Sequence, residues 1–449
     1  MSHDSQKWPQ VTPAESARLA RVASRTLAKL SNESRNEVLT AVAEALEHSR
    51  QRILEANEQD CRSAGPAVAA GKMTSAMFER LRMDQHGINE MAMRVRDVVR
   101  LPDPLGRQIS ATELDDGLVL YKESCPLGVI GIVFESRPDV ISQVAALALK
   151  SGNAVLLKGG AEAANTNETL FEIWGHTLAG FLGIPKDFMH LLYTRSDVLE
   201  LLSLNREIDL IIPRGSRAFV EFVAQNSRIP VLGQGEGICH VFIDRMADLE
   251  TALRVTLDSK VQYPAACNAA ETLLVHESIA GEFLPLLVSK LKEAGVEVRG
   301  CAKTLAMLVG PGIVPATERD WSTEYSDLVL SVKIVASAVE AIEHIHRYGS
   351  GHTEAVVTKD RDTAKTFMDE IDAAGVYHNV STRFADGFRY GLGAELGVST
   401  NKLHARGPVG LEGLTTYKYR LFGNGHIVAE YASGTRHFKH RPLTGSGHQ

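Results

Sequence analysis

The sequence lacks the features that mark membrane, secreted or nucleic-acid-binding proteins. Its longest apolar runs, such as Val144–Leu149, fall far short of the roughly 20 residues that a membrane helix needs. The residues Met1–Trp8 contain no apolar segment of the kind found in secretory signals, so we expect a cytoplasmic protein. Lys and Arg number 48 against 55 Asp and Glu, a net charge of −7 with no basic excess for nucleic acid. We therefore expect neither a membrane nor a nucleic acid as a partner.

Cysteine is scarce and scattered. The chain has five, and no two of them form a C-x-x-C pair. This spacing excludes a zinc site and a disulfide framework, and it indicates a reducing compartment. His344 and His346 are two residues apart on a predicted helix, so they face different sides and do not form a metal pair. We expect no bound metal, and composition does not say whether any thiol is reactive. The cysteines are Cys61, Cys125, Cys239, Cys267 and Cys301.

The glycine-rich nucleotide fingerprints are also absent. The glycines of Gly233–Gly237 do not have the G-x-G-x-x-G spacing. The segment Gly65–Met73 resembles a P-loop, but five residues rather than four separate its glycines, and methionine replaces the Ser or Thr. It also lies between predicted helices instead of after a strand. The sequence therefore excludes the standard dinucleotide and nucleoside-triphosphate fingerprints.

The pattern of apolar residues changes along the chain. Helical spacing begins at a capping box, Thr12-Pro13-Ala14-Glu15, and a third helix is expected near Arg50–Cys61. From Gly128 onward buried strands alternate with helices, with a further strand opening at Val231. A second series of the same kind follows Asp244. Such alternation predicts an α/β fold with parallel, doubly wound sheets, which bind ligands at the carboxyl ends of their strands.

Some short β-like stretches have no obvious place in either α/β series. A β-hairpin is expected at Gln108–Leu114 and Leu118–Ser124, and strand-like segments at Leu414–Tyr419 and His426–Ala429. Because a lone hairpin is only marginally stable, these stretches need partners. The polar tail from Gly434 onward is expected to be frayed.

Three places carry chemistry-bearing residues. Lys158-Gly159-Gly160 ends an apolar strand, where a lysine can lie over a ribose or phosphate or simply occupy a surface turn. Pro213-Arg214-Gly215-Ser216 turns a strand into a helix, which suits either phosphate binding or ordinary capping by the serine. Cys267 stands among small residues in a loop, as a nucleophile would, although most cysteines are small buried apolar residues. Spacing alone leaves these alternatives open.

The chain resembles the γ-glutamyl phosphate reductase (glutamate-5-semialdehyde dehydrogenase) family, a branch of the aldehyde dehydrogenase superfamily. The resemblance extends from the N-terminal helices to about Lys418, in ordered blocks at family spacing. These blocks are Gly128–Pro138, Ser151–Gly160, Ile208–Ser216, Gly237–Asp244, Pro264–Leu274, Ser381–Gly387 and Gly391–Pro408.

The resemblance implies an activity and a domain plan. The activity is NADPH-dependent reduction of L-glutamyl 5-phosphate to L-glutamate 5-semialdehyde and phosphate, the second step from glutamate to proline. It implies a functional link to glutamate 5-kinase and a homodimer or larger homo-oligomer. The expected parts are a Rossmann-like NADP-binding domain at 1–106 and 125–253, an α/β catalytic domain at 254–412, a β-hairpin oligomerisation element at 107–124 and 413–430, and a polar tail at 431–449.

The resemblance also assigns residues to the cofactor and the nucleophile. Cys267 becomes the nucleophile that forms a thioester. Lys158, with Gly160 beside it, is expected at the adenosine ribose. Gly215 and Ser216 are expected near the pyrophosphate, and Glu395 at the nicotinamide ribose.

The substrate contacts are less defined. The developing oxyanion needs donors, and the backbone N–H of Cys267 is one of them. Most aldehyde dehydrogenases supply an Asn side chain where this sequence has Ser136, so the second donor is Ser136, Asn268 or a backbone group. Arg137 is expected to meet the phosphate or the α-carboxylate of the substrate, and Arg406 is a second candidate.

The departures from the superfamily pattern bear on the reaction and the cofactor. The segment Pro230–Gly235 lacks the Glu base that hydrolyses a thioester, and Glu236 is off register. This loss favours acyl-phosphate reduction over oxidation to an acid, although a CoA-acylating dehydrogenase also lacks the base. Ala161 replaces a Glu that binds the ribose 2′-hydroxyl, which favours NADP, whereas the adjacent Glu162 could repel a 2′-phosphate. The alternative to an enzyme is a non-catalytic scaffold protein of the same family. The presence of Cys267 argues against it.

Overall fold

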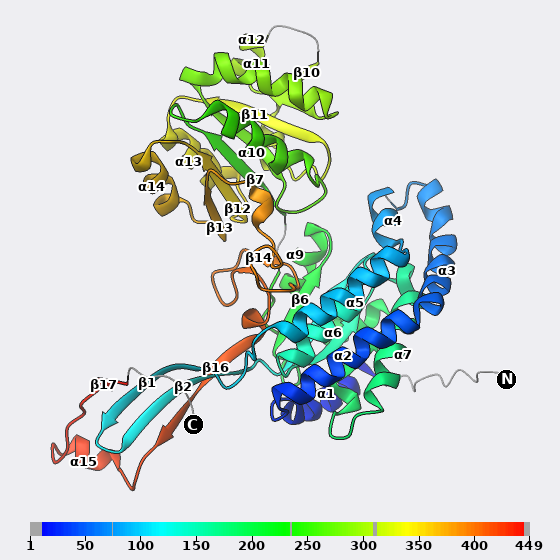
Figure 1. Cartoon of the computed structure of the whole chain (residues 1–449), viewed down its shortest axis with the longest axis vertical. Helices are drawn as coiled ribbons and strands as arrows, with labels where there is room; N and C mark the ends of the chain where they lie inside the picture. The colour runs from blue at the N-terminus through cyan, green and yellow to red at the C-terminus, as the bar shows by residue number, and fades with distance from the viewer. Residues whose placement is uncertain (1–10, 74, 234–235, 309–311, 444–449) are drawn as a thin grey trace. The chain divides into compact units, whose positions relative to one another are not determined.

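The computed structural model describes residues 11–73, 75–233, 236–308 and 312–443, which divide into two compact units (Figure 1). The first unit combines the described residues up to Pro213 with Asn226–Val231 and with the chain from Gly410 on. The second unit comprises Arg214–Gln225 and Leu232–Val409. The first unit is therefore built from segments that are far apart in sequence.

Helices open the first unit. α1 begins where the sequence predicted, because Thr12 accepts a hydrogen bond from the backbone N–H of Glu15 (3.3 Å) and Pro13 takes the first helical position. The third helix continues to Ala69 instead of ending near Cys61. Its last turns are held by apolar packing, in which Ala64 contributes to a buried cluster with Leu81. The helices are α1 (Pro13–Leu27), α2 (Asn32–His48), α3 (Arg50–Ala69), α4 (Ser75–Leu81) and α5 (Gln85–Arg100).

A four-stranded sheet forms the centre of the first unit, in the order β5-β4-β3-β6. β3 and β4 are parallel, as are β4 and β5. Almost every residue of β3 and β4 is buried, as the apolar runs predicted. The strand expected at Val231 is reduced to one bridge with Ile211. The strands are β3 (Val129–Phe134), β4 (Ala154–Lys158), β5 (Met189–Leu192) and β6 (Leu210–Arg214), and the helices of this unit that follow them are α6 (Val140–Lys150), η1 (Ala161–Ala163), α7 (Ala164–Leu178), η2 (Lys186–Phe188) and α8 (Arg195–Leu201). Helix α9 (Arg217–Asn226) comes after β6 and falls almost wholly in the second unit.

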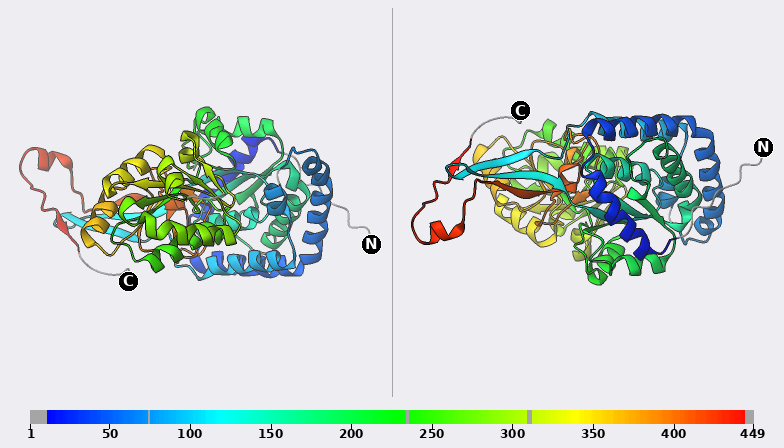
Figure 2. Two further views of the ribbon diagram at one scale, coloured as in Figure 1. Left: turned by 90° about the horizontal axis from the view of Figure 1, so that it is seen from above. Right: turned by 90° about the horizontal axis from the view of Figure 1, so that it is seen from below.

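An antiparallel sheet extends from the helices of the first unit, as Figure 2 shows. The predicted hairpin is present as β1 (Gln108–Asp115) and β2 (Leu118–Pro126). The predicted strand after Leu414 is β16 (Thr415–Phe422), which pairs with β2 along its whole length. The hairpin thus has the partner it needs, and we call this sheet the β-arm.

Two expectations for the C-terminal region are wrong. The stretch His426–Ala429 is not a strand, because Val428 and Ala429 begin helix α15 (Val428–Ala432). The tail is not frayed up to residue 443, since β17 (Arg441–Pro442) pairs with β1 and Lys439 N–H donates to Leu114 O (2.7 Å). Ion pairs of Arg436 and Lys439 with Asp115 hold it there. Its last part, 444–449, lies outside the described residues.

The second unit is organised around a parallel sheet in the order β10-β9-β11-β8-β7-β12-β13. β7 falls inside the range 125–253 expected for the first domain, yet it pairs with β8 and β12 here. Its five buried residues need apolar neighbours on both faces, which this sheet provides. The strands are β7 (Cys239–Ile243), β8 (Ala270–His276), β9 (Glu297–Gly300), β10 (Ile313–Pro315), β11 (Val329–Val335), β12 (Thr353–Val357) and β13 (Gly375–His378).

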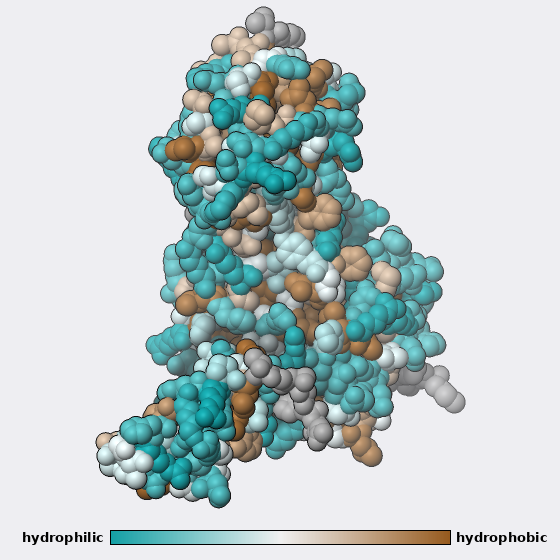
Figure 3. All heavy atoms as spheres, turned by 60° about the vertical axis from the view of Figure 1, so that its left-hand side comes forward, coloured by the Kyte–Doolittle hydropathy of each residue, from teal (hydrophilic) through white to brown (hydrophobic). Residues whose placement is uncertain are grey.

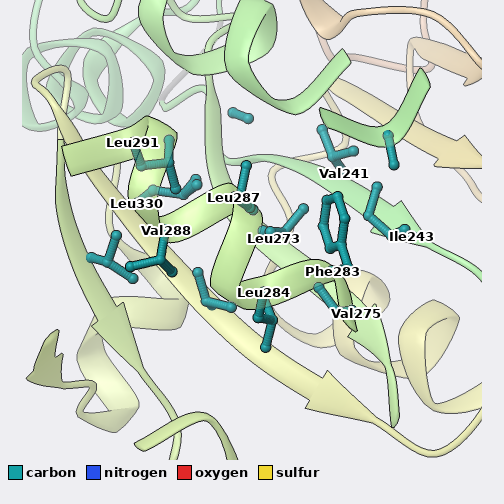
Figure 4. Packing of buried hydrophobic residues seen from close by; sticks show 14 of the residues in the cluster. Val241, Ile243, Leu273, Val275, Phe283, Leu284, Leu287, Val288, Leu291 and Leu330 are labelled. Carbon is teal, nitrogen blue, oxygen red and sulfur yellow. The ribbon is translucent and has the colours of Figure 1, made fainter. Parts of the chain in front are cut away.

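Helices pack on this sheet. The apolar stripe of α11 contributes Phe283, Leu287 and Leu291 to a cluster with β7, β8 and β11 (Figure 4). A second cluster includes Phe242 and Phe367. The helices are α10 (Leu249–Val261), α11 (Glu277–Glu293), α12 (Ala302–Met307), α13 (Ala338–Tyr348) and α14 (Arg361–Glu370), and short elements are η3 (Glu318–Ser322), η4 (Thr382–Phe384), β14 (Val398–Ser399), β15 (Gly407–Pro408) and, in the first unit, η5 (Glu412–Leu414).

Polar residues dominate the face shown in Figure 3, with apolar ones scattered among them. None of the helices in the described ranges is both long enough and apolar enough to cross a bilayer.

Candidate active site

Cys267 lies in a loop between the end of α10 and the start of β8, at the amino edge of the second sheet. Its side chain is half-buried, and it forms no disulfide. Two backbone bonds fold the loop tightly, from Ala266 N–H to Tyr263 O (3.2 Å) and from Ala269 N–H to Ala266 O (2.9 Å). We call residues 262–269 the nucleophile loop. The nucleophile loop places the Cys267 thiol near the start of β8, and short turns hold the backbone of the loop.

Gly237, just before β7, and Cys239, the first residue of β7, both contact the backbone of Cys267. A Cβ on Gly237 would lie 1.8 Å from the carbonyl oxygen of Cys267 and 2.7 Å from its Cα. Only glycine allows so close an approach of two backbones. The buried thiol of Cys239 donates to the same carbonyl (3.4 Å), and burial raises the pKa of that thiol far above its ordinary range. Cys239 is therefore an inert support for Cys267.

Gly237→Ala is expected to lower kcat by about 100-fold, because the methyl group must push the Cys267 backbone aside and small displacements of a reacting group are costly. Steady-state kinetics would measure this loss. Gly281→Ala in α11 is the matched control, since nothing lies within 4 Å of its added Cβ, and it should retain full activity. An active Gly237→Ala enzyme would show that the loop tolerates the shift.

A buried ion pair closes the base of the nucleophile loop. Lys260, in the last turn of α10, donates from Nζ to Oε2 of Glu271 on β8 (2.6 Å), and both side chains are fully buried. Burial lowers the pKa of Lys260, and burial raises the pKa of Glu271 to about 8 against the opposing charge of Lys260. The pair joins the two elements from which the loop emerges.

The turn at 381–385 holds the loop from a second side. Ser259 donates to Ser381 Oγ (3.1 Å), and Asn268 Nδ2 donates to Ala385 O (2.9 Å). The side chain of Arg383 in η4 donates from Nε to Gln262 Oε1 (2.8 Å) and lies over the ring of Tyr263. Arg383 was not predicted as a site residue, although it lies in the matching block Ser381–Gly387. The signal that could have pointed to Arg383 was its place in this block, to which the sequence assigned no function.

The other expected residues of the second unit have structural partners. The amide of Asn268 is directed at Ala385 O, away from a role as oxyanion donor. Glu395 accepts a bond from Gly387 N–H (2.7 Å), and burial raises the pKa of its carboxyl. Arg406 forms an ion pair with Asp372 (2.8 Å), so its charge is already met.

The expected residues of the first unit follow strands β3 and β4. Lys158 at the end of β4 is half-buried and forms no ion pair with any residue in the described ranges, and burial lowers its pKa. Ser136 after β3 has φ 44°, and its N–H and hydroxyl both donate to Glu162 Oε1 (2.7 and 2.8 Å). Gly160 leaves room for that carboxylate, since a Cβ there would lie 2.0 Å from Glu162 Oε1. Arg137 beside Ser136 is half-buried.

Gly215 and Ser216 are exposed between β6 and α9. Ser216 Oγ accepts a long hydrogen bond from Phe219 N–H (3.4 Å), as a capping serine does. The expected residues thus fall into two groups. Ser136, Arg137, Lys158 and Gly160 belong to the first unit, and Gly215, Ser216, Cys267, Asn268, Glu395 and Arg406 to the second.

Residues 7–320 match the model of the aldehyde dehydrogenase family. γ-Glutamyl phosphate reductase from Synechococcus sp. strain JA-3-3Ab is 53% identical over 424 residues, which cover 94% of this chain and 93% of that protein. The enzyme of that name from Pelotomaculum thermopropionicum is 50% identical, covering 96% and 97%. The crystal structure of γ-glutamyl phosphate reductase from Thermotoga maritima superposes with a TM-score of 0.88 at 43% identity, covering 93% of this chain and all of that one. The chain belongs to the γ-glutamyl phosphate reductase branch of the aldehyde dehydrogenase family. The resemblance and the fold class expected from the sequence are confirmed.

In the described ranges, no group of three or more His, Cys, Asp or Glu side chains is placed to hold a metal ion.

Proposed function

We propose that this enzyme reduces L-glutamyl 5-phosphate to L-glutamate 5-semialdehyde and phosphate with NADPH, in the biosynthesis of proline. The observation that carries the proposal is the braced nucleophile loop with Cys267 among small residues, in a chain whose segment Pro230–Gly235 lacks a hydrolytic Glu base. A thioester formed there is protected from activated water and remains available for reduction.

The chain's residues account for the covalent steps. The Cys267 thiolate attacks the acyl carbon, a carbon–sulfur bond forms, and the bond to phosphate breaks with its electron pair leaving on oxygen. The backbone N–H of Cys267 is our choice of oxyanion donor, because Ser136 and Asn268 direct their donors to Glu162 and Ala385. NADPH supplies the hydride that reduces the thioester carbonyl. Cleavage of the carbon–sulfur bond then releases the semialdehyde and restores the thiol.

The residues after β3 and β4 fit NADP. Lys158 is a half-buried ammonium without an ion-pair partner among the described residues, which suits donation to ribose hydroxyls. The carboxylate of Glu162 is held by Ser136, so it is directed into the loop after β3 and not at a 2′-phosphate. Ala161 supplies no carboxylate of its own. Together these features favour NADP over NAD. We propose Gly160, Gly215, Ser216 and Glu395 as further contacts of the cofactor. Arg137 and Arg406 remain proposed contacts of the substrate.

The reverse reaction tests the proposed function. Glutamate semialdehyde should reduce NADP only when inorganic phosphate is present, and NAD should support a lower rate. The measurement is absorbance of the reduced cofactor with phosphate, with CoA, and with neither. Activity with CoA alone would assign the chain to the acylating dehydrogenases instead.

We further propose that glutamate 5-kinase supplies the acyl phosphate, and that the enzyme works as a homodimer or larger oligomer in a reducing compartment, the cytoplasm. The β-arm supports the oligomer, because its edge strand β16 exposes aromatic and apolar side chains, including Tyr419 (60% exposed) and Leu421 (56%). Light scattering should give a mass of at least two chains. A monomer at micromolar concentration would contradict this arrangement.

A further inference from the structure

Arg383 is a buried cation held against the nucleophile loop. Only 7% of the residue is exposed. Its Nε donates to Gln262 and its guanidinium lies over Tyr263, the first two residues of the loop. At the other end of the loop, Asn268 donates to Ala385 in the same turn as Arg383. Residues on both sides of Cys267 are thus tied to the turn that carries this arginine.

The charge of Arg383 has no carboxylate partner in the described ranges. Asp258 and Asp386 act on it only from beyond ion-pair distance. Burial lowers the pKa of Arg383, Arg389 lowers it further, and the charge of the Cys267 thiolate acts in the opposite direction. A buried cation without a counter-ion is costly unless an anion completes the site. The sulfur of Cys267 and a bound anion are the groups that can do so.

The substrate offers two anions, and position distinguishes them. The phosphate is bonded through oxygen to the carbon that the thiolate attacks, whereas the α-carboxylate is separated from that carbon by the rest of the glutamyl chain. A cation beside the nucleophile therefore faces the phosphate. Because Nε is bound to Gln262, the two Nη groups remain to form a fork on phosphate oxygens.

We propose that Arg383 binds the phosphoryl group of the acyl phosphate, and inorganic phosphate in the reverse direction. This inference rests on the proposed function. As the carbon–oxygen bond breaks, the electron pair stays on the phosphate oxygen, and the guanidinium meets the charge that grows there. Arg383 is then a catalytic residue that also selects phosphate over an uncharged acceptor.

The test is the reverse reaction with phosphate and semialdehyde varied separately. Arg383→Gln should raise the KM for phosphate by about 10- to 100-fold, as expected for loss of a charge-assisted fork, with the KM for the semialdehyde changed less than about threefold. Arg383→Lys keeps the charge without the fork and should fall between wild type and Arg383→Gln. If the Arg383→Gln protein does not fold, Arg383→Lys is the variant whose KM for phosphate tests the proposal.

Controls separate binding from structure. Arg347→Gln removes the same charge from an exposed arginine of the second unit and should leave both KM values unchanged. Thermal unfolding and the rate of Cys267 alkylation by iodoacetamide report whether the nucleophile loop keeps its form. An unchanged phosphate KM, or a rise confined to the semialdehyde KM, would overturn the proposal. A wild-type enzyme that needs no phosphate would instead overturn the proposed function, and this inference with it.

Discussion

Cys267→Ala should lose at least about 10⁴-fold in kcat for phosphate-dependent oxidation of the semialdehyde, because we propose that the thioester forms on the sulfur of Cys267. Cys239 cannot substitute for it, since that thiol is fully buried and donates to the Cys267 carbonyl. Cofactor binding should persist, since the proposed contacts Lys158 and Glu395 are untouched. Stopped-flow kinetics and fluorescence titration with NADPH would measure the two properties separately.

Cys125→Ala is the matched control for this loss. Cys125 is a half-buried thiol on β2 of the β-arm, and we assign no chemistry to it. It should retain wild-type turnover. Equal inactivity of folded wild-type and Cys267→Ala protein would favour a non-catalytic scaffold.

Lys260→Met should reduce the free energy of unfolding by about 3–5 kcal/mol at pH 8, because Glu271 loses its buried partner and stays buried only by taking up a proton. The loss should shrink as the pH falls. Burial already raises the pKa of Glu271 to about 8, and removing Lys260 raises it further, so the folded variant holds a proton that the unfolded chain releases. A group with a raised pKa in the folded state stabilises at low pH and loses that effect as the pH rises through this value. Denaturation in urea at pH 8 and pH 5.5 measures the difference.

Two further variants define the cause. Lys260→Met with Glu271→Leu should recover most of the lost stability, because an apolar pair replaces an ion pair of similar size. Lys359→Met breaks an exposed ion pair with Asp248 and should leave the stability close to that of wild type. A loss in Lys260→Met that is the same at both pH values would show that packing, rather than the Glu271 charge, is responsible.

Local pattern was enough to predict much of the fold. The start of helix α1 at Thr12 was predictable because a few neighbouring residues form its cap. The hairpin of the β-arm was predictable in the same way, from the residues of its turn. The pairing of β7 was not predictable from pattern, because five buried residues suit either of two parallel sheets. Helix α15 was missed because the apolar run Ile427–Ala429 at its start is also typical of a short strand.

Some residues of the candidate site could be predicted from the sequence, and others could not. Cys267 was one of three candidates from the residues alone, and only the resemblance assigned it as the nucleophile. The rule for parallel sheets points to carboxyl ends, whereas this residue precedes β8 at the amino edge. Gly237 and Arg383 were not predicted, because their importance lies in contacts with the nucleophile loop from segments outside it. Lys260 was not predicted either, because its pairing with Glu271 depends on how the loop between them folds. The engagement of Ser136 by Glu162 is a contact of this type as well.

The discontinuous first unit has a consequence for how the chain folds during synthesis. Asn153 Nδ2 donates to the carbonyl of Leu414, 261 residues later, and β2 must wait for β16 to complete its ladder. The segment Leu232–Val409, which forms most of the second unit, leaves the ribosome before that strand exists. Because loop closure over such distances is slow, the second unit should mature first and the first unit last. Until then the hairpin edge of β2 stays open, and this nascent stage is where the enzyme is most exposed to misassembly with other copies.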